Sequence, residues 1–184
     1  MPAYLEGTTM IDASRYLERE TLRNGLEVCF RAARPDDWER VVEAFNELDP
    51  ESVYLRFFAP KKDLSEADLK NFREADFRNR VILLCTVMRD GREIVIASAT
   101  YVRVGEADAE VAFVVEEDYH RLGIAGRLLR HLGRIARAGG IGTFVAEVLP
   151  HNSGMLGVFE RSGWPTAAKK ADGTVHVTVA LNDG

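Results

Sequence analysis

The feature that most constrains the fold is a stretch in which a strand pattern, a glycine-containing turn and a helix pattern follow one another. Residues 109–115, AEVAFVV, form an apolar run of strand length. Residues 122–139, LGIAGRLLRHLGRIARAG, place apolar side chains at helical spacing and end in glycine. Residues 143–149, TFVAEVL, return to a strand pattern. This order predicts a crossover between two parallel strands.

The segments on either side of this crossover predict antiparallel hairpins. Strand runs flank Asp90-Gly91 and Asp172-Gly173, and both pairs are typical hairpin turns. A further strand is predicted at 26–33, and helices are predicted at 34–50, 51–60, 64–75 and 153–163. Ser65 followed by Asp68 resembles a capping box at the start of the helix at 64–75. We therefore expect an α/β (α+β) fold with a central mixed, mostly antiparallel sheet of about seven strands flanked by helices.

The chain length fits one domain, because 184 residues can bury a sufficient core without disulfides or metals. Residues 1–24 are polar and mixed, and we interpret them as an N-terminal extension with a short helix at 14–22. The domain itself is expected to span residues 25–184. The net charge of −5 argues weakly against a nucleic-acid partner.

The sequence also indicates a cytoplasmic protein. Its N-terminus lacks the apolar segment of a signal peptide, and no run reaches the roughly 20 apolar residues of a membrane helix. Cys29 and Cys85 lie in apolar runs and are expected to be buried thiols. Neither these cysteines nor the four histidines show metal-ligand spacing, so we predict no metal.

The start of the helix at 122–139 has the features of an anion site. The first amides of a helix are unpaired, and the helix dipole favours negative charge. Gly123, Ala125 and Gly126 keep the backbone accessible, and positive charge is added by Arg121, Arg127 and Arg130. A P-loop is excluded because GIAGRL lacks Gly-Lys-Ser/Thr, and a dinucleotide fold is excluded because G-x-G-x-x-G is absent. The pattern predicts a cradle for a diphosphate.

The turn HRLGIA resembles the Q/R-x-x-G-x-G/A signature of the Gcn5-related N-acetyltransferases (GNAT). Gly123 and Ala125 fill its two small positions, whereas His120 stands where the family usually has Gln or Arg. A second segment, VLPHNSGMLGVFERSGW at 148–164, is similar to the family's strand, asparagine and helix with a Gly-aromatic ending. The resemblance covers residues 26–181 and implies the GNAT fold with acetyl-CoA as cofactor.

The resemblance also implies which residues bind acetyl-CoA. Backbone amides of the loop would bind the diphosphate, the strand edge from Phe113 to Val115 would pair with the pantetheine arm, and Asn152 would donate a hydrogen bond to that arm. The cofactor-binding candidates are Phe113, Val115, Arg121, Leu122, Gly123, Ala125, Gly126, Arg127 and Asn152.

A narrower resemblance lies upstream. Residues 49–69, DPESVYLRFFAPKKDLSEADL, look like a segment of the bacterial Pat-type protein-lysine acetyltransferases, which acetylate proteins such as acyl-CoA synthetases. AEVAFVV is similar to their catalytic strand, so the resemblance implies Glu110 as general base and a protein lysine as acceptor. The reaction also requires a base, because a lysine side chain has a pKa near 10.4 and must lose a proton before its amine attacks a thioester. Tyr54, Phe57 and Phe58 are expected to pack under the sheet while lining the acceptor side.

Two further functions remain open at this point. One is a small-molecule amine N-acetyltransferase, and the other is a non-catalytic acyl-CoA-binding sensor. The sensor is kept open by His120 and by Phe159, which stands where the family often has a tyrosine acid. The other acidic residues around Glu110 are expected to be solvated loop charges: Glu106, Asp108, Glu116 and Glu117.

Overall fold

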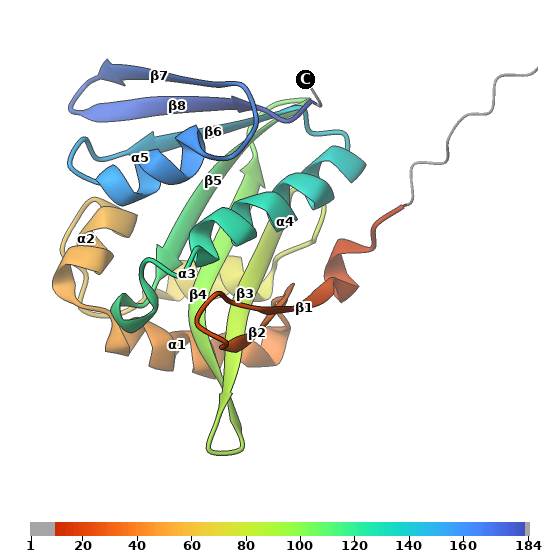
Figure 1. The fold of residues 1–184 in the computed structure, drawn as a ribbon, viewed down its shortest axis with the longest axis vertical. Helices are drawn as coiled ribbons and strands as arrows, with labels where there is room; N and C mark the ends of the chain where they lie inside the picture. The colour runs from red at the N-terminus through yellow and green to blue at the C-terminus, as the bar shows by residue number, and fades with distance from the viewer. Residues whose placement is uncertain (1–9, 183–184) are drawn as a thin grey trace, which may run out of the picture.

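The computed structural model describes residues 10–182, and within them one open sheet has the strand order β1-β2-β3-β4-β5-β6-β8-β7 (Figure 1). Neighbouring strands are antiparallel except for β5 and β6, which are parallel. The strands are β1 (Leu17–Thr21), β2 (Glu27–Ala32), β3 (Arg80–Arg89), β4 (Arg92–Arg103), β5 (Asp108–Val115), β6 (Thr143–Val148), β7 (Thr166–Ala171) and β8 (Thr174–Ala180). The predicted mixed, mostly antiparallel α/β fold is confirmed, with one strand more than expected.

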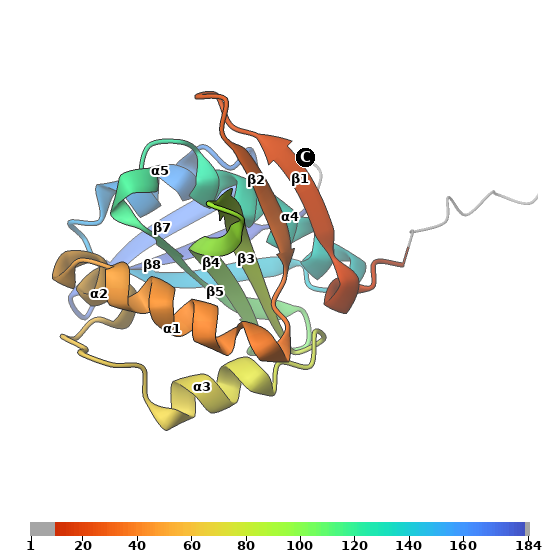
Figure 2. The same ribbon diagram turned by 90° about the horizontal axis from the view of Figure 1, so that it is seen from below.

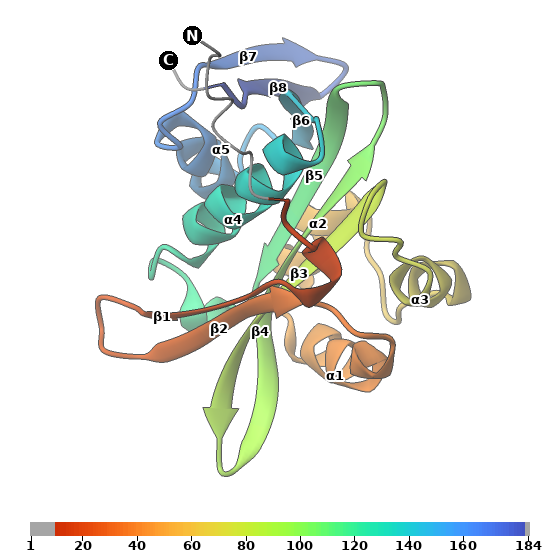
Figure 3. The ribbon, with the colours of Figure 1, turned by 90° about the vertical axis from the view of Figure 1, so that its right-hand side faces the viewer.

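Helices cover both faces of the sheet (Figures 2 and 3). α1 (Trp38–Glu47), α2 (Pro50–Phe57) and α3 (Glu66–Arg73) lie on one face. α4 (Ile124–Ala138) and α5 (Ser153–Glu160) lie on the other. Three short 3₁₀ turns complete the elements: Ala13–Arg15, Pro35–Asp37 and Glu117–Tyr119. Within residues 10–182, no helix combines the length and apolar character needed to cross a bilayer.

Side chains fix where several of these helices begin. Asp49 accepts a hydrogen bond from the Ser52 amide at 2.7 Å at the start of α2. Ser65 and Asp68 form the predicted capping box of α3. Each cap satisfies a backbone amide that the helix leaves unpaired, which is why these polar residues stand immediately before apolar helical runs.

The N-terminal segment differs from the prediction. The expected helix at residues 14–22 is wrong, because a 3₁₀ turn is followed there by β1, which pairs with β2 from Leu17↔Arg31 to Thr21↔Glu27. The exposed edge of β2 offers backbone partners for this segment, and those outweigh its weak helical pattern. The division at residue 25 falls in the turn of this hairpin, so β1 of the expected extension belongs to the sheet.

The main core lies between the sheet and α4, and its largest buried members include Phe30, Leu83, Tyr101 and Phe144. The opposite face, under α1 and α3, has a much smaller cluster around Ile82, Leu84 and Val95. The second face is therefore less completely filled than the first, and this is where a cavity lies.

The two cysteines differ in exposure. Cys85 on β3 is fully buried as expected, whereas Cys29 on β2 is only partly buried. Cys29 pairs with Arg19 of the short edge strand β1, which gives it incomplete cover. Burial raises the pKa of both thiols, so neither is activated as a nucleophile.

Candidate active site

The central feature of the site is the separation of two parallel strands. β5 and β6 pair only over Asp108–Glu110 and Thr143–Val145, although β5 continues to Val115 and β6 to Val148. A cleft of about 40 Å³ opens where they part, and Phe113 and Asn152 line it. The edge of β5 that faces β6 has no ladder partner beyond Glu110. Its amides and carbonyls are therefore free to bind an extended ligand.

The start of α4 is open, as an anion cradle requires. Gly123 is the N-cap residue with φ +79°, a backbone conformation that favours glycine. A Cβ at Gly123 or Gly126 would meet no heavy atom within 4 Å. The first turn of α4 contains no acidic residue. The unpaired amides of this turn can therefore accept an anion without displacing a carboxylate.

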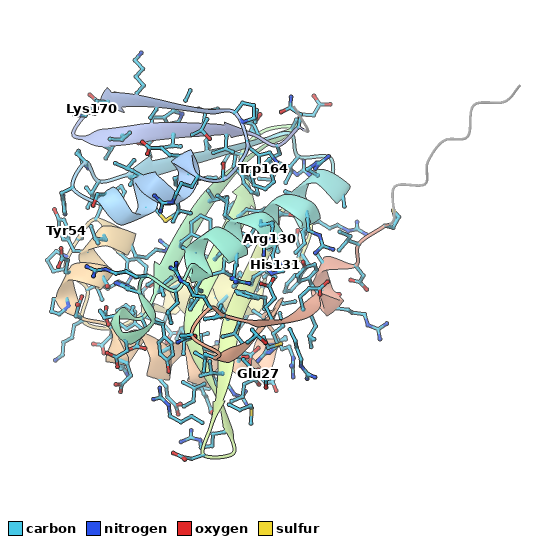
Figure 4. The ribbon with its side chains drawn as sticks, viewed as in Figure 1. Glu27, Tyr54, Arg130, His131, Trp164 and Lys170 are labelled. Atoms are coloured by element: carbon cyan, nitrogen blue, oxygen red, sulfur yellow. The ribbon has the colours of Figure 1, made fainter. Side chains whose placement is uncertain are left out.

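The arginines around this helix start have partners that the sequence did not reveal. Arg127 forms an ion pair with Glu20 of β1, and Arg130 reaches the same carboxylate at 3.3 Å. Arg121 is exposed, and its carbonyl accepts a hydrogen bond from the Arg23 side chain. Figure 4 shows Arg130 on α4 close to the N-terminal hairpin. Because β1 was not predicted, Glu20 was missed as a residue of this region.

The remaining cofactor candidates fall into two groups. Phe113 and Asn152 line the cleft, whereas Val115 and Leu122 pack against the main core and line neither cavity. The Asn152 oxygen accepts a hydrogen bond from the Met155 amide at 3.1 Å and so caps α5, which leaves the side-chain NH₂ free to donate. Ala125 lies half-buried in the first turn of α4.

Phe159 closes the inner side of the cleft. It is 1% exposed, and its ring lies 6.0 Å from that of Phe113 in an edge-to-face contact. The phenylalanine side chain at this position has no proton to donate. Any acid for a leaving thiolate must come from another residue or from water.

Glu110 lies on the other face of the sheet, towards α2. It is exposed and pairs with Val102 of β4 and Val145 of β6. Its carboxylate acts electrostatically on Arg56 of α2 but forms no salt bridge with it. Glu110 thus stands at the point where β5 and β6 separate, on the face opposite α4.

A larger cavity of about 280 Å³ lies on the same face as Glu110, between the sheet and α1–α3. Most of its lining is apolar and includes Phe45, Phe57 and Phe72. Arg56 lines both this cavity and the cleft between β5 and β6, so the two spaces lie on either side of its side chain. No role for Arg56 was predicted from the sequence.

The prediction that Glu116 is a solvated loop charge is wrong. Glu116 is partly buried and lines the larger cavity. Burial raises the pKa of its carboxyl, and the carboxylates of Asp118 and Glu117 act in the same direction. The two-residue period of β5 places Glu116 on the face of Glu110, a signal that could have been used. Glu117 also differs from the expectation, since its side chain accepts a hydrogen bond from the Asp49 amide at 3.0 Å.

Comparison with known proteins places this arrangement in a family. Residues 38–164 match the Acetyltransferase (GNAT) family, and this match covers more than half of the chain. The chain therefore belongs to the Acetyltransferase (GNAT) family. Members of this family use acetyl-CoA.

Individual relatives agree with that assignment. The chain is similar to the crystal structure of the GNAT domain of S. lividans PAT, with 35% identity, a TM-score of 0.81, and coverage of 89% of this chain and 96% of that one. It is 33% identical to the acetyltransferase Pat of Mycolicibacterium smegmatis over 77% of this chain but only 42% of that protein. It is 30% identical to an acetyltransferase of Pseudomonas aeruginosa over 66% of each chain.

Proposed function

We propose that this protein is an acetyl-CoA-dependent N-acetyltransferase that transfers the acetyl group to a lysine side chain of a protein. The observation that carries this proposal is the separation of β5 from β6, with Glu110 at its closed end and the open start of α4 at the other. Five residues of strand separate Glu110 from Val115, or roughly 16 Å. This distance suits an extended arm between a thioester and a diphosphate.

The cofactor would be held mainly by backbone groups. The diphosphate would bind the free amides of the first turn of α4, and the pantetheine amides would pair with the unpaired edge of β5 around Phe113. Asn152 would donate its side-chain NH₂ to the arm from the opposite wall of the cleft. Among the arginines, Arg121 is exposed and free of any salt bridge within residues 10–182, whereas Arg127 must be shared with Glu20.

Glu110 would act as the general base. It would take a proton from the lysine ammonium, directly or through water, because the protonated amine has no lone pair for attack. The amine nitrogen then forms a C–N bond to the thioester carbonyl carbon, and the C–S bond breaks. The CoA thiolate leaves readily because a thiol has a pKa of only about 8.5, and water can supply its proton.

The likeness to two Pat proteins supports a protein acceptor. The exposed surface of α2 beside the cleft also supports a protein acceptor. The expectation that Tyr54 and Phe58 pack under the sheet is wrong, because they are 41% and 37% exposed, and Figure 4 shows Tyr54 at the outer side of α2. Only Phe57 is turned inward, where it packs against Phe45 at 6.0 Å. Exposed aromatic side chains are typical of surfaces that bind other proteins.

A free amine is the second candidate acceptor, and the larger cavity favours it. Its volume of about 280 Å³ and its apolar lining would suit a compact amine with an apolar body. The two acceptors require different access. A protein lysine must reach Glu110 from the exposed surface, whereas a free amine would be enclosed.

The test offers both kinds of acceptor to the full-length protein with acetyl-CoA. An acyl-CoA synthetase and a panel of free amines would be incubated separately, and acetylated products identified by mass spectrometry. Acetylation at specific lysines of the protein acceptor is the expected result. Acetylation of free amines alone would replace the protein-lysine proposal by the second candidate.

A further inference from the structure

Arg56 is an arginine without a counter-ion at the meeting point of two cavities. Within residues 10–182 its guanidinium forms no hydrogen bond and no salt bridge, and it lies only over the Phe57 ring, 4.8 Å from the ring centroid. Its side chain is partly buried, between the cleft and the larger cavity. A guanidinium in such surroundings retains its charge and five donors, so it can bind an anion strongly.

The nearest carboxylates do not serve as its partner. Asp68 is already bound by Lys61 at 2.5 Å and by the Ser65 hydroxyl at 2.7 Å. Glu110 acts on Arg56 only at a distance. Burial lowers the pKa of the Arg56 guanidinium, while Asp68 and Glu110 act in the opposite direction. A bound anion would offset this burial cost in a way that the described protein groups do not.

We propose that Arg56 is a carboxylate-binding residue for a small molecule held beside the thioester. The carboxylate can come from either of two sources: the far end of a dicarboxylic acyl chain on the CoA donor, or an amine acceptor that also carries a carboxylate. Both sources place the anion in the larger cavity or at its entrance, where Arg56 reaches from α2. The planar two-nitrogen geometry of arginine matches both oxygens of a carboxylate.

This inference rests on the proposed function only in that the cleft between β5 and β6 holds the acyl-CoA arm. It adds a preference for a ligand that carries a carboxylate. Transfer of an acetyl group does not explain such a preference, because the acetyl group carries no charge. The aliphatic lining of the larger cavity, including Leu48 and Leu69, would accommodate the carbons between the thioester and the carboxylate.

The first arm of the test concerns the donor. Calorimetry on the full-length protein would compare succinyl-CoA with butyryl-CoA and glutaryl-CoA with pentanoyl-CoA, because each pair has equal chain length and differs in the carboxylate. The second arm concerns the acceptor and compares leucine with 3-methylbutylamine, both added to the protein–CoA complex. The carboxylate-bearing member should bind about tenfold tighter or more in at least one arm, and that arm identifies the source.

Two variants assign the effect to Arg56. Arg56→Met keeps the length of the side chain and should abolish the preference, while Arg56→Lys keeps the charge but lacks the planar pair of donors and should reduce it. Arg92→Met, at an arginine that is 75% exposed on the β3–β4 hairpin, is the matched control and should retain the preference. Equal binding within each pair in the wild type, or a preference that survives Arg56→Met, would overturn the inference. Because binding needs no turnover, failure of the lysine acetylation assay would leave these results interpretable.

Discussion

The carboxylate of Glu20 on β1 holds the guanidinium of Arg127 on α4, one turn from the open start of that helix. The same carboxylate lies 2.7 Å from Nε2 of His131, whose Nδ1 lies 2.6 Å from the Tyr16 hydroxyl. Figure 4 shows His131 on the side of α4 that faces this hairpin. We therefore expect this N-terminal strand to limit the positive charge that the helix start offers to a diphosphate.

Replacing Glu20 by Gln should release Arg127. We expect the affinity for CoA to rise roughly two- to fivefold, because the energy of a partly exposed ion pair no longer competes with diphosphate binding. Calorimetric titration at low and moderate salt measures this, and the gain should shrink as salt increases. An affinity that is unchanged at low salt would mean that Arg127 does not approach the cofactor.

Gly126→Ala separates cofactor approach from helix stability. A Cβ at Gly126 meets no protein atom within 4 Å, so alanine should leave the fold intact or stabilise it by about 0.5–1 kcal/mol through helix propensity. Acetyl-CoA affinity should nevertheless fall, because the methyl group would occupy the space proposed for the diphosphate. Thermal unfolding and calorimetry report the two effects separately, and full affinity would contradict the cradle.

Gly133→Ala on the same helix is the matched control. Its Cβ would lie 2.3 Å from a ring carbon of Trp164, so this substitution should lower the melting temperature through a packing clash. CoA affinity of the protein that remains folded should not change. Gly126→Ala should therefore weaken binding without lowering stability, whereas Gly133→Ala should lower stability without weakening binding.

Asn152 has two roles that different substitutions distinguish. Asn152→Asp keeps an oxygen that can cap α5 but loses the NH₂ donor, whereas Asn152→Ala loses both. We expect both variants to bind acetyl-CoA more weakly, and only the alanine variant to lose about 1 kcal/mol of stability. If Asn152→Asp bound the cofactor normally, Asn152 would be a helix cap only.

The buried pair of Arg31 and Asp37 sets a pH dependence of stability. Two hydrogen bonds of 2.7 and 2.8 Å join them, at 2% and 1% exposure. Burial acts to raise the pKa of Asp37, but hydrogen bonds from Arg31 and from the Arg34 amide outweigh it, and the pKa lies below 3.8. The stabilisation of the fold by the ionised Asp37 carboxylate is therefore present above pH 3.8, and it is lost as the pH falls through the lowered pKa.

Asp37→Asn should consequently lower the unfolding free energy at neutral pH by about 3 kcal/mol, because it leaves Glu93, 2.7 Å from Nε, as the remaining carboxylate partner of the buried Arg31. Chemical denaturation at pH 7 and near pH 3 measures the effect. The difference in unfolding free energy between the variant and the wild type should narrow on acidification, because Asp37 of the wild type becomes protonated and loses its charge. A constant difference across this range would show that the ionised form of Asp37 is not what stabilises the fold.

Sequence patterns were sufficient wherever local signals and the fold agree. The turns at Asp90-Gly91 and Asp172-Gly173 and the capping box at Ser65 each use a few adjacent residues, and all three occur as predicted. β1 could not be predicted in this way. Its pairing depends on the free edge of β2, which is a property of the assembled sheet.

Gly123 and Asn152 lie at the starts of α4 and α5, and their part in cofactor binding stays a prediction. Both were singled out from the sequence, Gly123 by its place in a strand-to-helix turn and Asn152 through the family resemblance. Glu20 and Arg56 were not, because their importance comes from contacts between distant segments. Glu116 was missed because the strand face on which it lies was assumed to end at Val115.

Glu110 is proposed as the base of the acetyl transfer. The most direct test follows CoA thiol release from acetyl-CoA with a lysine-bearing acyl-CoA synthetase as acceptor, using wild type, Glu110→Gln and Glu116→Gln across pH. Glu110→Gln should bind acetyl-CoA normally and lower the rate roughly 10²–10⁴-fold, whereas Glu116→Gln, some six strand residues away, should retain most of the rate. An unchanged rate in Glu110→Gln at every pH would contradict the account, and loss of the rate only in Glu116→Gln would transfer the role of base to Glu116.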